Sequence, residues 1–141
     1  MTLQFVPAEE SDIPVIFEQA RNLIDAYEDI DSIDYDKVLA WVKRKIRNHI
    51  CEYQCVIVDG ERCGYYRLCA DGELDDLYVL PKFQNKGIGS HILNKCIHIS
   101  EKPVYLYVFI RNTRAIALYE RFGFIYRESV GTTRAIMSRK G

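Results

Sequence analysis

One stretch, Leu77 to Ser90 (L-Y-V-L-P-K-F-Q-N-K-G-I-G-S), constrains the fold more than any other part of the chain. A short apolar run ends at Pro81, and a loop that contains Gly87 and Gly89 follows it. Beyond the loop, apolar residues recur at helical spacing, at Ile88, Ile92, Leu93 and Cys96. This order predicts a strand, a tight turn and the start of a helix.

The start of that helix is a candidate anion site. The first N–H groups of a helix have no partner within it, and the positive end of the peptide dipole lies there, so phosphate binds well. Lys82 and Lys86 add positive charge beside the loop. The pattern is QxxGxG, from Gln84 to Gly89; the P-loop pattern is absent, and Ile92 replaces the third glycine of the dinucleotide fingerprint. The alternative is a turn whose glycines only permit unusual backbone angles.

Composition limits the size and the class of partner. With 141 residues, of which 48% are hydrophobic, the chain predicts a single domain, residues 1–141, with a substantial core. A net charge of -1 and a pI near 6.3 argue against a protein whose whole surface binds nucleic acid or a membrane. No apolar run approaches the ~20 residues that span a bilayer. The partner is therefore expected to be small or locally recognised.

The cysteines and histidines predict no metal site. The 5 cysteines form no CxxC pair, and the 3 histidines show no ligand spacing. The N-terminus lacks the basic and apolar regions of a signal peptide, so the cytoplasm is the expected compartment. Four cysteines lie in apolar patterns and are predicted to be core thiols: Cys55, Cys63, Cys69 and Cys96.

Two helices are predicted before the central sheet. The first follows a short strand at 3–6, and its apolar residues recur at intervals of three and four between Ile13 and Tyr27. The second has Val38, Trp41, Val42 and Ile46 on its apolar side, and the remaining basic residues are expected to form a solvated face: Lys43, Arg44, Lys45 and Arg47. The connection between the helices carries too much like charge to lie against a core; its acidic residues are Glu28, Asp29, Asp31, Asp34 and Asp36.

The rest of the chain predicts an α/β (α+β) fold. Three strands, 53–58, 62–68 and 74–79, form an antiparallel meander across Asp59-Gly60 and Asp71-Gly72, where both turn residues need positive φ. A helix at 87–100 carries the chain back, so that 104–108 runs parallel to 74–79. A helix from Asn112 to Gly123 and a hairpin of 124–130 with 133–137 complete the chain. The prediction is a mixed, mainly antiparallel twisted sheet with helices on both faces, in the order β-α-α-β-β-β-α-β-α-β-β.

Two segments carry a resemblance to a known family. The run L-x-x-L-Y-V-L-P-K-F-Q-N-K-G-I-G-S resembles motif A of the GCN5-related N-acetyltransferase (GNAT) family. The run R-N-T-R-A-I-A-L-Y-E-R-F-G-F resembles the N-x-x-A-x-x-x-Y-x-x-x-G-F pattern of its motif B. Together, in this order and spacing, the two motifs are highly specific, and the similarity covers nearly the whole chain.

The resemblance implies acetyl-coenzyme A as cosubstrate. Backbone groups of Leu77 and Val79 would hold the pantetheine arm, and amides of the glycine loop would hold the pyrophosphate. Asn112 would hydrogen-bond the cofactor, and Tyr119 would lie beside its sulfur. The cofactor-binding residues implied in the motif A loop are Gln84, Asn85, Lys86, Gly87, Ile88, Gly89 and Ser90.

The chemistry that the family implies needs an acid, a base and an oxyanion donor. A substrate amine with a pKa near ~10.4 must lose a proton before it attacks the thioester. The N–H of Val79 would stabilise the oxyanion, and Tyr119 would protonate the departing thiolate; the alternative for Tyr119 is an aromatic packing residue. The candidate bases are Glu73, Asp75 and Asp76, which could equally be turn or edge charges, with ordered water relaying the proton.

The sequence thus predicts an acyltransferase that moves an acetyl group to a primary amine of a small molecule or peptide, by direct attack in a ternary complex. A non-catalytic acyl-coenzyme A sensor and a GNAT-like assembly module stay open as alternatives. Relatives that acetylate ribosomal-protein N-termini carry glutamate at the position of Tyr107. Its absence here argues against ribosomal-protein N-termini as the substrate. Two interpretations of the acidic connection at 28–36 stay open: it attracts a cationic acceptor, or it is only a solvated connection between two helices. Whether two copies form a homodimer is left open.

Overall fold

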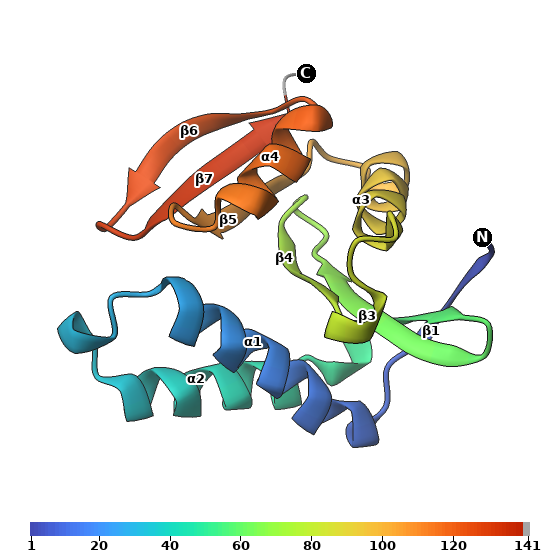
Figure 1. The fold of residues 1–141 in the computed structure, drawn as a ribbon, viewed down its shortest axis with the longest axis horizontal. Coiled ribbons are helices and arrows are strands. Elements are labelled where there is room, and N and C mark those ends of the chain that lie inside the picture. Colours follow the sequence, from blue (N-terminus) through green and yellow to red (C-terminus); the bar gives the residue numbers. More distant parts are fainter. Residues whose placement is uncertain (140–141) are drawn as a thin grey trace.

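The computed structural model describes residues 1–139 of the chain. Its helices and strands follow the predicted order (Figure 1). The helices are α1 (Ile13–Tyr27), α2 (Tyr35–Asn48), α3 (Ile88–Ile99) and α4 (Thr113–Arg121). The strands are β1 (Leu3–Pro7), β2 (Gln54–Val58), β3 (Glu61–Leu68), β4 (Leu74–Val79), β5 (Tyr105–Phe109), β6 (Phe124–Val130) and β7 (Arg134–Arg139). The predicted fold class is confirmed, with boundaries shifted by one or two residues; Lys140 and Gly141 of the predicted domain lie outside the described residues.

The strands form two antiparallel sheets rather than one continuous sheet. Their orders are β1-β2-β3-β4 and β5-β7-β6. The predicted parallel direction of β4 and β5 is confirmed at an isolated parallel bridge between Glu73 and Tyr105. There the N–H of Tyr105 donates to the carbonyl of Gly72 at 3.0 Å. Beyond this bridge the two strands are not hydrogen-bonded to each other.

A β-bulge at Asp75 accounts for the divergence of β4 from β5. Leu68 pairs with Leu74 and Arg67 pairs with Asp76, so Asp75 has no partner on β3. An extra residue of this kind bends its strand and increases its twist. The bend carries β4 away from β5 immediately after the bridge.

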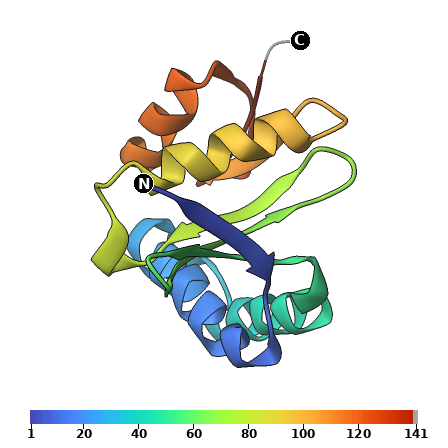
Figure 2. The ribbon, with the colours of Figure 1, turned by 90° about the vertical axis from the view of Figure 1, so that its right-hand side faces the viewer.

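Helices cover both faces of the first sheet. Figures 1 and 2 show α1 and α2 on one side of it and α3 on the other, with α4 against the second sheet. Two apolar clusters result, and the one under α3 and α4 includes Ile92, Leu93 and Leu106, all at most 2% exposed. The cluster under α1 and α2 includes Ile16 and Ile46. Among residues 1–139, no helix has the length and apolar character to cross a membrane.

The two Asp-Gly turns differ. At the β2–β3 turn both residues have positive φ, 51° at Asp59 and 79° at Gly60, as predicted. At the β3–β4 connection only Gly72 does, at 99°, so the expectation for Asp71 is wrong. That connection is longer than two residues, and it is closed by a bond of 3.0 Å from the N–H of Gly72 to the carbonyl of Cys69.

Gly72 is expected to be essential for joining the two sheets. A Cβ at this position would lie 2.3 Å from the carbonyl oxygen of Pro103, in the loop before β5, and φ is already left-handed. Gly72→Ala should therefore lower the free energy of unfolding by about 2–3 kcal/mol in urea. Gly60→Ala is the matched control: φ is +79° but no atom lies within 4 Å, so only about 1 kcal/mol of backbone strain is expected. Equal losses would contradict the clash.

Candidate active site

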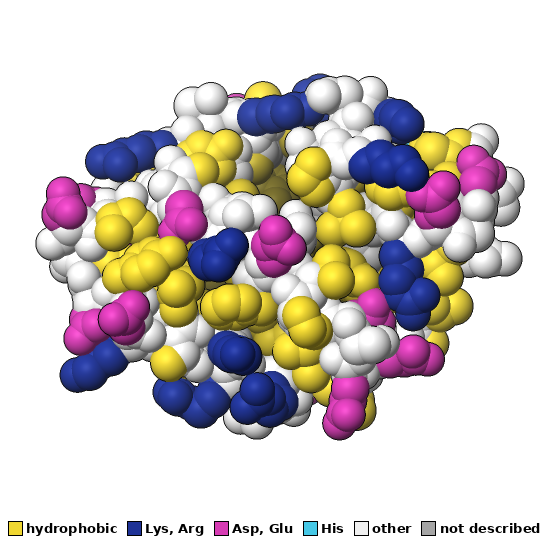
Figure 3. Space-filling view, turned by 60° about the horizontal axis from the view of Figure 1, so that its bottom comes forward, with side chains coloured by type: hydrophobic (Ala, Val, Ile, Leu, Met, Phe, Trp, Pro, Cys, Tyr) yellow, Lys and Arg dark blue, Asp and Glu magenta, His cyan; other side chains and the backbone are white. Residues whose placement is uncertain are grey.

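The free edge of β4 faces the opening between the two sheets. The N–H of Leu80 donates to the carbonyl of Cys63 on β3 at 2.9 Å. Since polar groups alternate in direction along a strand, the N–H and C=O groups of Leu77 and Val79 point away from β3. Gln84 Nε2 donates to the carbonyl of Val79 at 3.0 Å. The N–H of Val79 has no side-chain hydrogen-bond partner among residues 1–139. In the space-filling view a hollow with hydrophobic side chains lies between the upper and lower halves of the molecule (Figure 3).

The glycine loop presents a set of amides at the end of β4. Gly87 is the N-cap of α3 with φ +80°, and Asn85 is also left-handed at φ +65°. Within residues 1–139 no hydrogen-bond partner is found for the backbone N–H groups of 85–90. A Cβ at Gly87 would meet no protein atom within 4 Å. These amides can accept an anion, as the sequence predicts.

Charge beside this loop comes from two lysines with different surroundings. Lys82 pairs with Glu61 at 2.8 Å, so part of its charge is already compensated. Lys86 lies over the Phe83 ring, 5.8 Å from its centroid, and forms no ion pair among the described residues. Lys86 is the better placed of the two to attract an anion.

Helix α4 forms the other side of the opening. The Asn112 side-chain oxygen caps this helix by accepting from the N–H of Ala115 at 3.2 Å. Its NH₂ group makes no hydrogen bond with the described residues, so it can still donate to a ligand. Arg114 donates to the side-chain oxygen of Asn85 and so ties α4 to the glycine loop. No sequence signal distinguished Arg114 from an ordinary exposed arginine.

Tyr119 combines a packed ring with an unpartnered hydroxyl. Its ring centroid lies 5.8 Å from that of Phe124, which agrees with the packing alternative. Its hydroxyl has no hydrogen-bond partner in residues 1–139. Burial, and after it the charge of Asp76, raises the pKa of Tyr119 to about 12. The phenol is therefore protonated at neutral pH and can act as a donor.

The three candidate bases have different surroundings. Asp76 is 8% exposed and accepts hydrogen bonds from Tyr53, from Tyr78 at 2.7 Å and from Lys45 at 3.2 Å. Asp75 accepts from Arg67 at 2.8 Å and pairs with Lys45 at 3.1 Å. These donors engage both oxygens of Asp76 and Oδ2 of Asp75. Both aspartates are thus held in place more than they are available for proton transfer.

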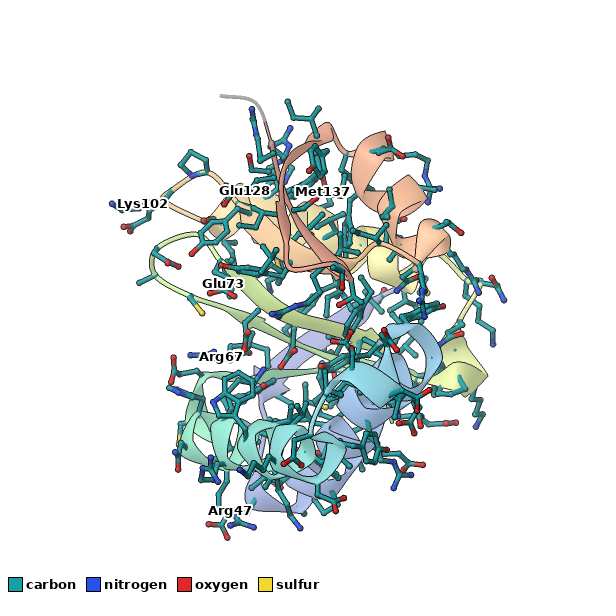
Figure 4. The ribbon with its side chains drawn as sticks, turned by 90° about the vertical axis from the view of Figure 1, so that its left-hand side faces the viewer. Arg47, Arg67, Glu73, Lys102, Glu128 and Met137 are labelled. Carbon is teal, nitrogen blue, oxygen red and sulfur yellow. The ribbon has the colours of Figure 1, made fainter. Side chains whose placement is uncertain are left out.

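Glu73 is the carboxylate left without a partner. It is half-buried, and within residues 1–139 no hydrogen bond or ion pair engages its side chain. Burial, and then the charges of Asp75 and Asp71, raises its pKa above the usual range. Figure 4 shows Glu73 between Arg67 and Glu128 on one side of the molecule. A raised pKa makes a carboxylate a stronger proton acceptor.

The prediction that Lys45 lies on the solvated face of α2 is wrong. The expected solvated face included this residue, yet its side chain is only 16% exposed and points at Asp75 and Asp76. Trp41, expected on the apolar side, is 57% exposed instead. The buried stripe of α2 runs through Val42 and Ile46, and Lys45 lies beside Ile46 on it. Apolar periodicity alone cannot find a buried lysine whose partners come from a distant strand.

Near the bridge, Cys69, Asp71 and Glu73 bring their ligand atoms within 4.8 Å of one another. Asp71 accepts a hydrogen bond of 2.6 Å from the Tyr105 hydroxyl. Burial raises the pKa of Cys69 to about 11, so the thiol is protonated at neutral pH. A protonated thiol is a poor metal ligand. The predicted core thiols Cys55, Cys63 and Cys96 are buried, whereas Cys69 is half-buried.

The acidic connection between α1 and α2 begins near the end of β5. The ring of Tyr27, at the end of α1, lies 6.4 Å from that of Phe109 on β5, so the connection starts beside the second sheet. Asp34 caps α2 by accepting from the N–H of Lys37 at 3.3 Å, while Asp31 is exposed. In Figure 3 acidic side chains lie at both ends of the molecule, and the α1–α2 connection lies at the left end in Figure 1. Tyr107, in place of a glutamate, is 44% exposed on β5.

Comparisons with known proteins bear on this arrangement. A spermine/spermidine N(1)-acetyltransferase of Bacillus subtilis (strain 168) is 41% identical over 56 residues, which are 36% of this chain and 37% of that protein. An uncharacterised N-acetyltransferase of Methanocaldococcus jannaschii is 37% identical over 62 residues, 41% of this chain and 27% of that protein. The matched segments thus span about a third of these curated relatives.

Solved structures share the fold over the whole chain. The PaiA N-acetyltransferase of Thermoplasma acidophilum, in complex with coenzyme A, has a TM-score of 0.74 and 21% identity, with 100% of both chains covered. A Vibrio cholerae spermidine N-acetyltransferase, in complex with coenzyme A and spermine, has a TM-score of 0.66 and 18% identity, with 96% of this chain and 94% of that one covered.

The family model for the acetyltransferase (GNAT) family matches residues 17–124. This range contains β4, the glycine loop, α3, β5 and α4, which form the opening and its two sides. Since the match covers more than half of the chain, the predicted resemblance is confirmed, and the chain belongs to the acetyltransferase (GNAT) family.

Proposed function

We propose that this protein is a single-domain N-acetyltransferase that uses acetyl-coenzyme A to acetylate a primary amine. The observation that carries the proposal is the opening between β4 and β5. It has an unpaired strand edge on one side, a set of unpartnered amides at its end, and a protonated, unpartnered phenol on the other side. A cosubstrate with an amide-containing arm, a pyrophosphate and a thioester matches these three features in this order.

The residues present fit acetyl-coenzyme A. The pyrophosphate would lie on the amides from Asn85 to Ser90, where a Cβ at Gly87 would meet no protein atom. The arm would extend the sheet by hydrogen bonds to Leu77 and Val79, as an added strand does. The free NH₂ of Asn112 would bind the arm from α4. Two structures with the same fold are complexes with coenzyme A, which supports coenzyme A as the ligand.

Transfer would proceed by direct attack of the amine on the thioester carbonyl. The N–H of Val79 would donate to the oxyanion of the tetrahedral intermediate. Collapse of that intermediate forms the amide and releases the thiolate, which Tyr119 would protonate. Glu73 is the proposed acceptor for the amine proton, directly or through water, because Asp75 and Asp76 are engaged by Lys45.

We further propose that the acceptor is cationic. One curated relative is a spermine/spermidine N(1)-acetyltransferase that this chain matches over about a third of its length, and one structure with the same fold is a spermidine N-acetyltransferase in complex with spermine. The acidic connection at 28–36 follows Tyr27, whose ring lies beside that of Phe109 at the end of β5, and its carboxylates would attract a cation to that side of the opening. The runner-up function, a sensor that binds acyl-coenzyme A without turnover, has the same binding features but no need for the unpartnered Tyr119 hydroxyl.

Two measurements test the function. Acetyl-coenzyme A should raise the melting temperature, which an assembly module without a ligand site would not show. Thiol release should then appear with at least one amine in a panel of polyamines, aminoglycoside-like bases and basic peptides. Stabilisation without thiol release for any amine would favour the sensor, and no stabilisation would contradict both.

A charge-removal variant tests the acidic connection. Asp31→Asn with Asp34→Asn removes two carboxylates but keeps the α2 cap, since asparagine caps as well as aspartate. At low salt kcat/KM for a cationic acceptor should fall by about 3- to 10-fold, and the difference should shrink at physiological salt, where the Debye length is about 8 Å. A neutral acceptor is the control. Equal kcat/KM ratios for both acceptors at every salt concentration would leave the segment as a connection only.

A further inference from the structure

Lys45 links a helix beside the opening to the strand that forms the opening. Its Nζ lies 3.1 Å from Asp75 Oδ2 and 3.2 Å from Asp76 Oδ2. In a regular strand two consecutive residues point to opposite faces. Because Asp75 is the bulged residue of β4, both carboxylates reach the side of α2 and meet the same ammonium group.

The two carboxylates need this cation. Their side chains are 16% and 8% exposed, and two adjacent buried carboxylates repel each other. Burial opposes the charged form of Lys45, but the attraction of Asp76 and Asp75 exceeds it, so the pKa of Lys45 is raised. Of the two aspartates, Arg67 contacts only Asp75. Tyr53 and Tyr78 donate to Asp76, but both are neutral. Lys45 is the one cation that both aspartates share among the described residues.

The bulge that Lys45 holds decides where the reacting end of the opening lies. Asp75 is the point at which β4 turns away from β5, and the amides of Leu77 and Val79 follow it. Asp76 lies close enough to Tyr119 for its charge to raise the pKa of that phenol. A shift at Asp75 or Asp76 would therefore displace the N–H of Val79, the proposed oxyanion donor. It would also change the electrostatic potential at the Tyr119 hydroxyl.

We propose that Lys45 is a positioning residue for acetyl transfer: it clamps Asp75 and Asp76 at the bulge of β4 and so fixes the opening opposite Tyr119. The inference rests on the proposed function and adds a residue on α2 to it. Lys45 touches neither the thioester nor the amine in this scheme. Its effect should appear mainly in kcat and less in the affinity for coenzyme A, because the amides proposed to bind the pyrophosphate lie in the glycine loop, beyond β4.

The test compares three variants of the full chain. Lys45→Met removes the charge and keeps the length, and it should lower kcat at least about tenfold while the Kd of coenzyme A changes less than about threefold. Lys45→Arg restores a cation that can pair with both carboxylates and should return kcat to within about fivefold of the wild type. Lys43→Met, an exposed lysine of the same helix that lies over Phe17, should leave kcat unchanged.

An amide spectrum separates positioning from a general loss of structure. If Lys45 holds the bulge of β4, the backbone amide resonances of Leu77 and Val79 should shift in Lys45→Met, while those of residues 85–90 keep their wild-type positions. The other groups that contact the pair, Arg67, Tyr53 and Tyr78, are unchanged in this variant. Lys45→Arg should return the two resonances toward their wild-type positions.

The following results would contradict the positioning role of Lys45. A Lys45→Met protein with the kcat and the Leu77 and Val79 amide resonances of Lys43→Met overturns the positioning role. If Lys45→Met does not fold, Lys45→Gln, which removes the charge but keeps a polar side chain, takes its place, and a wild-type kcat in that variant overturns the role as well. A wild-type protein that acetylates no amine contradicts the proposed function, and the positioning role falls with it; an active wild type with an unaffected variant contradicts the positioning role alone.

Discussion

Tyr119→Phe is expected to lower kcat by about 10²- to 10⁴-fold, the usual contribution of a positioned acid. The change removes only the hydroxyl, which has no hydrogen-bond partner in residues 1–139, so no buried group loses a bond. The ring keeps its contact with Phe124 at 5.8 Å. The melting temperature and the Kd of coenzyme A should therefore change little.

Tyr66→Phe is the matched control for this variant. Tyr66 is 4% exposed, its hydroxyl also lacks a partner among the described residues, and burial raises its pKa to about 12, as for Tyr119. It packs in the same apolar cluster but contacts Phe5 of β1, away from the opening. If both variants retain wild-type kcat at saturating substrates, with chemistry limiting the rate, Tyr119 is a packing residue only.

The pH dependence provides a second readout of the same role. The pKa of Tyr119 is raised to about 12, so the acid form is lost only when the pH approaches that value. The reactive form of the amine gains population as pH rises toward its own pKa, near ~10.4 for a lysine-like amine. kcat/KM should therefore rise with pH up to about 10, without a falling limb from Tyr119. A falling limb below pH 9 that Tyr119→Phe abolishes would contradict the raised pKa.

Gly87→Ala is expected to weaken coenzyme A binding at least about tenfold, because the added Cβ would stand where the pyrophosphate approaches the amides. Gly60→Ala is a close match, since both glycines have φ near +80° and neither added Cβ would meet a protein atom within 4 Å. Both variants should lose about 1 kcal/mol of stability from backbone strain. Only Gly87→Ala should lose affinity in calorimetric titration.

The outcome of this pair separates steric blocking from strain. Equal affinities for Gly60→Ala and Gly87→Ala, with both proteins folded, would show that coenzyme A does not approach the backbone at Gly87. Equal losses in both would show that affinity follows stability rather than the loop.

The elements were predictable because their signals are local. Gly87 at the start of α3, Asn112 as the cap of α4 and the Asp59-Gly60 turn each act within a few residues. The position of the opening also follows from these, since it requires only the order of a strand, a glycine loop and a returning strand.

The contacts inside the opening were not predictable, because they depend on register and on distant partners. The sequence L-D-D-L in β4 gives no sign that Asp75 is bulged, so neither the division into two sheets nor the joint position of Asp75 and Asp76 could be derived. Helical periodicity predicts a solvated Lys45, because it takes account only of neighbours within the helix. The partners of Lys45 lie about thirty residues away in the chain. Glu73 could be separated from the two aspartates only once their ion pairs were known.

The central claim, direct transfer within a ternary complex, is tested most directly by measuring free thiol, amide product and intact-protein mass in one experiment. The thiols Cys69 and Cys96 have pKa values raised to about 11 and about 12, mainly by burial, so neither is expected to carry the acetyl group. With acetyl-coenzyme A alone the protein should gain no acetyl mass and release no thiol. On addition of a cationic amine, one thiol should appear for each amide formed. A burst of thiol equal to the enzyme before any amine is added, with an acetylated protein, would contradict direct transfer.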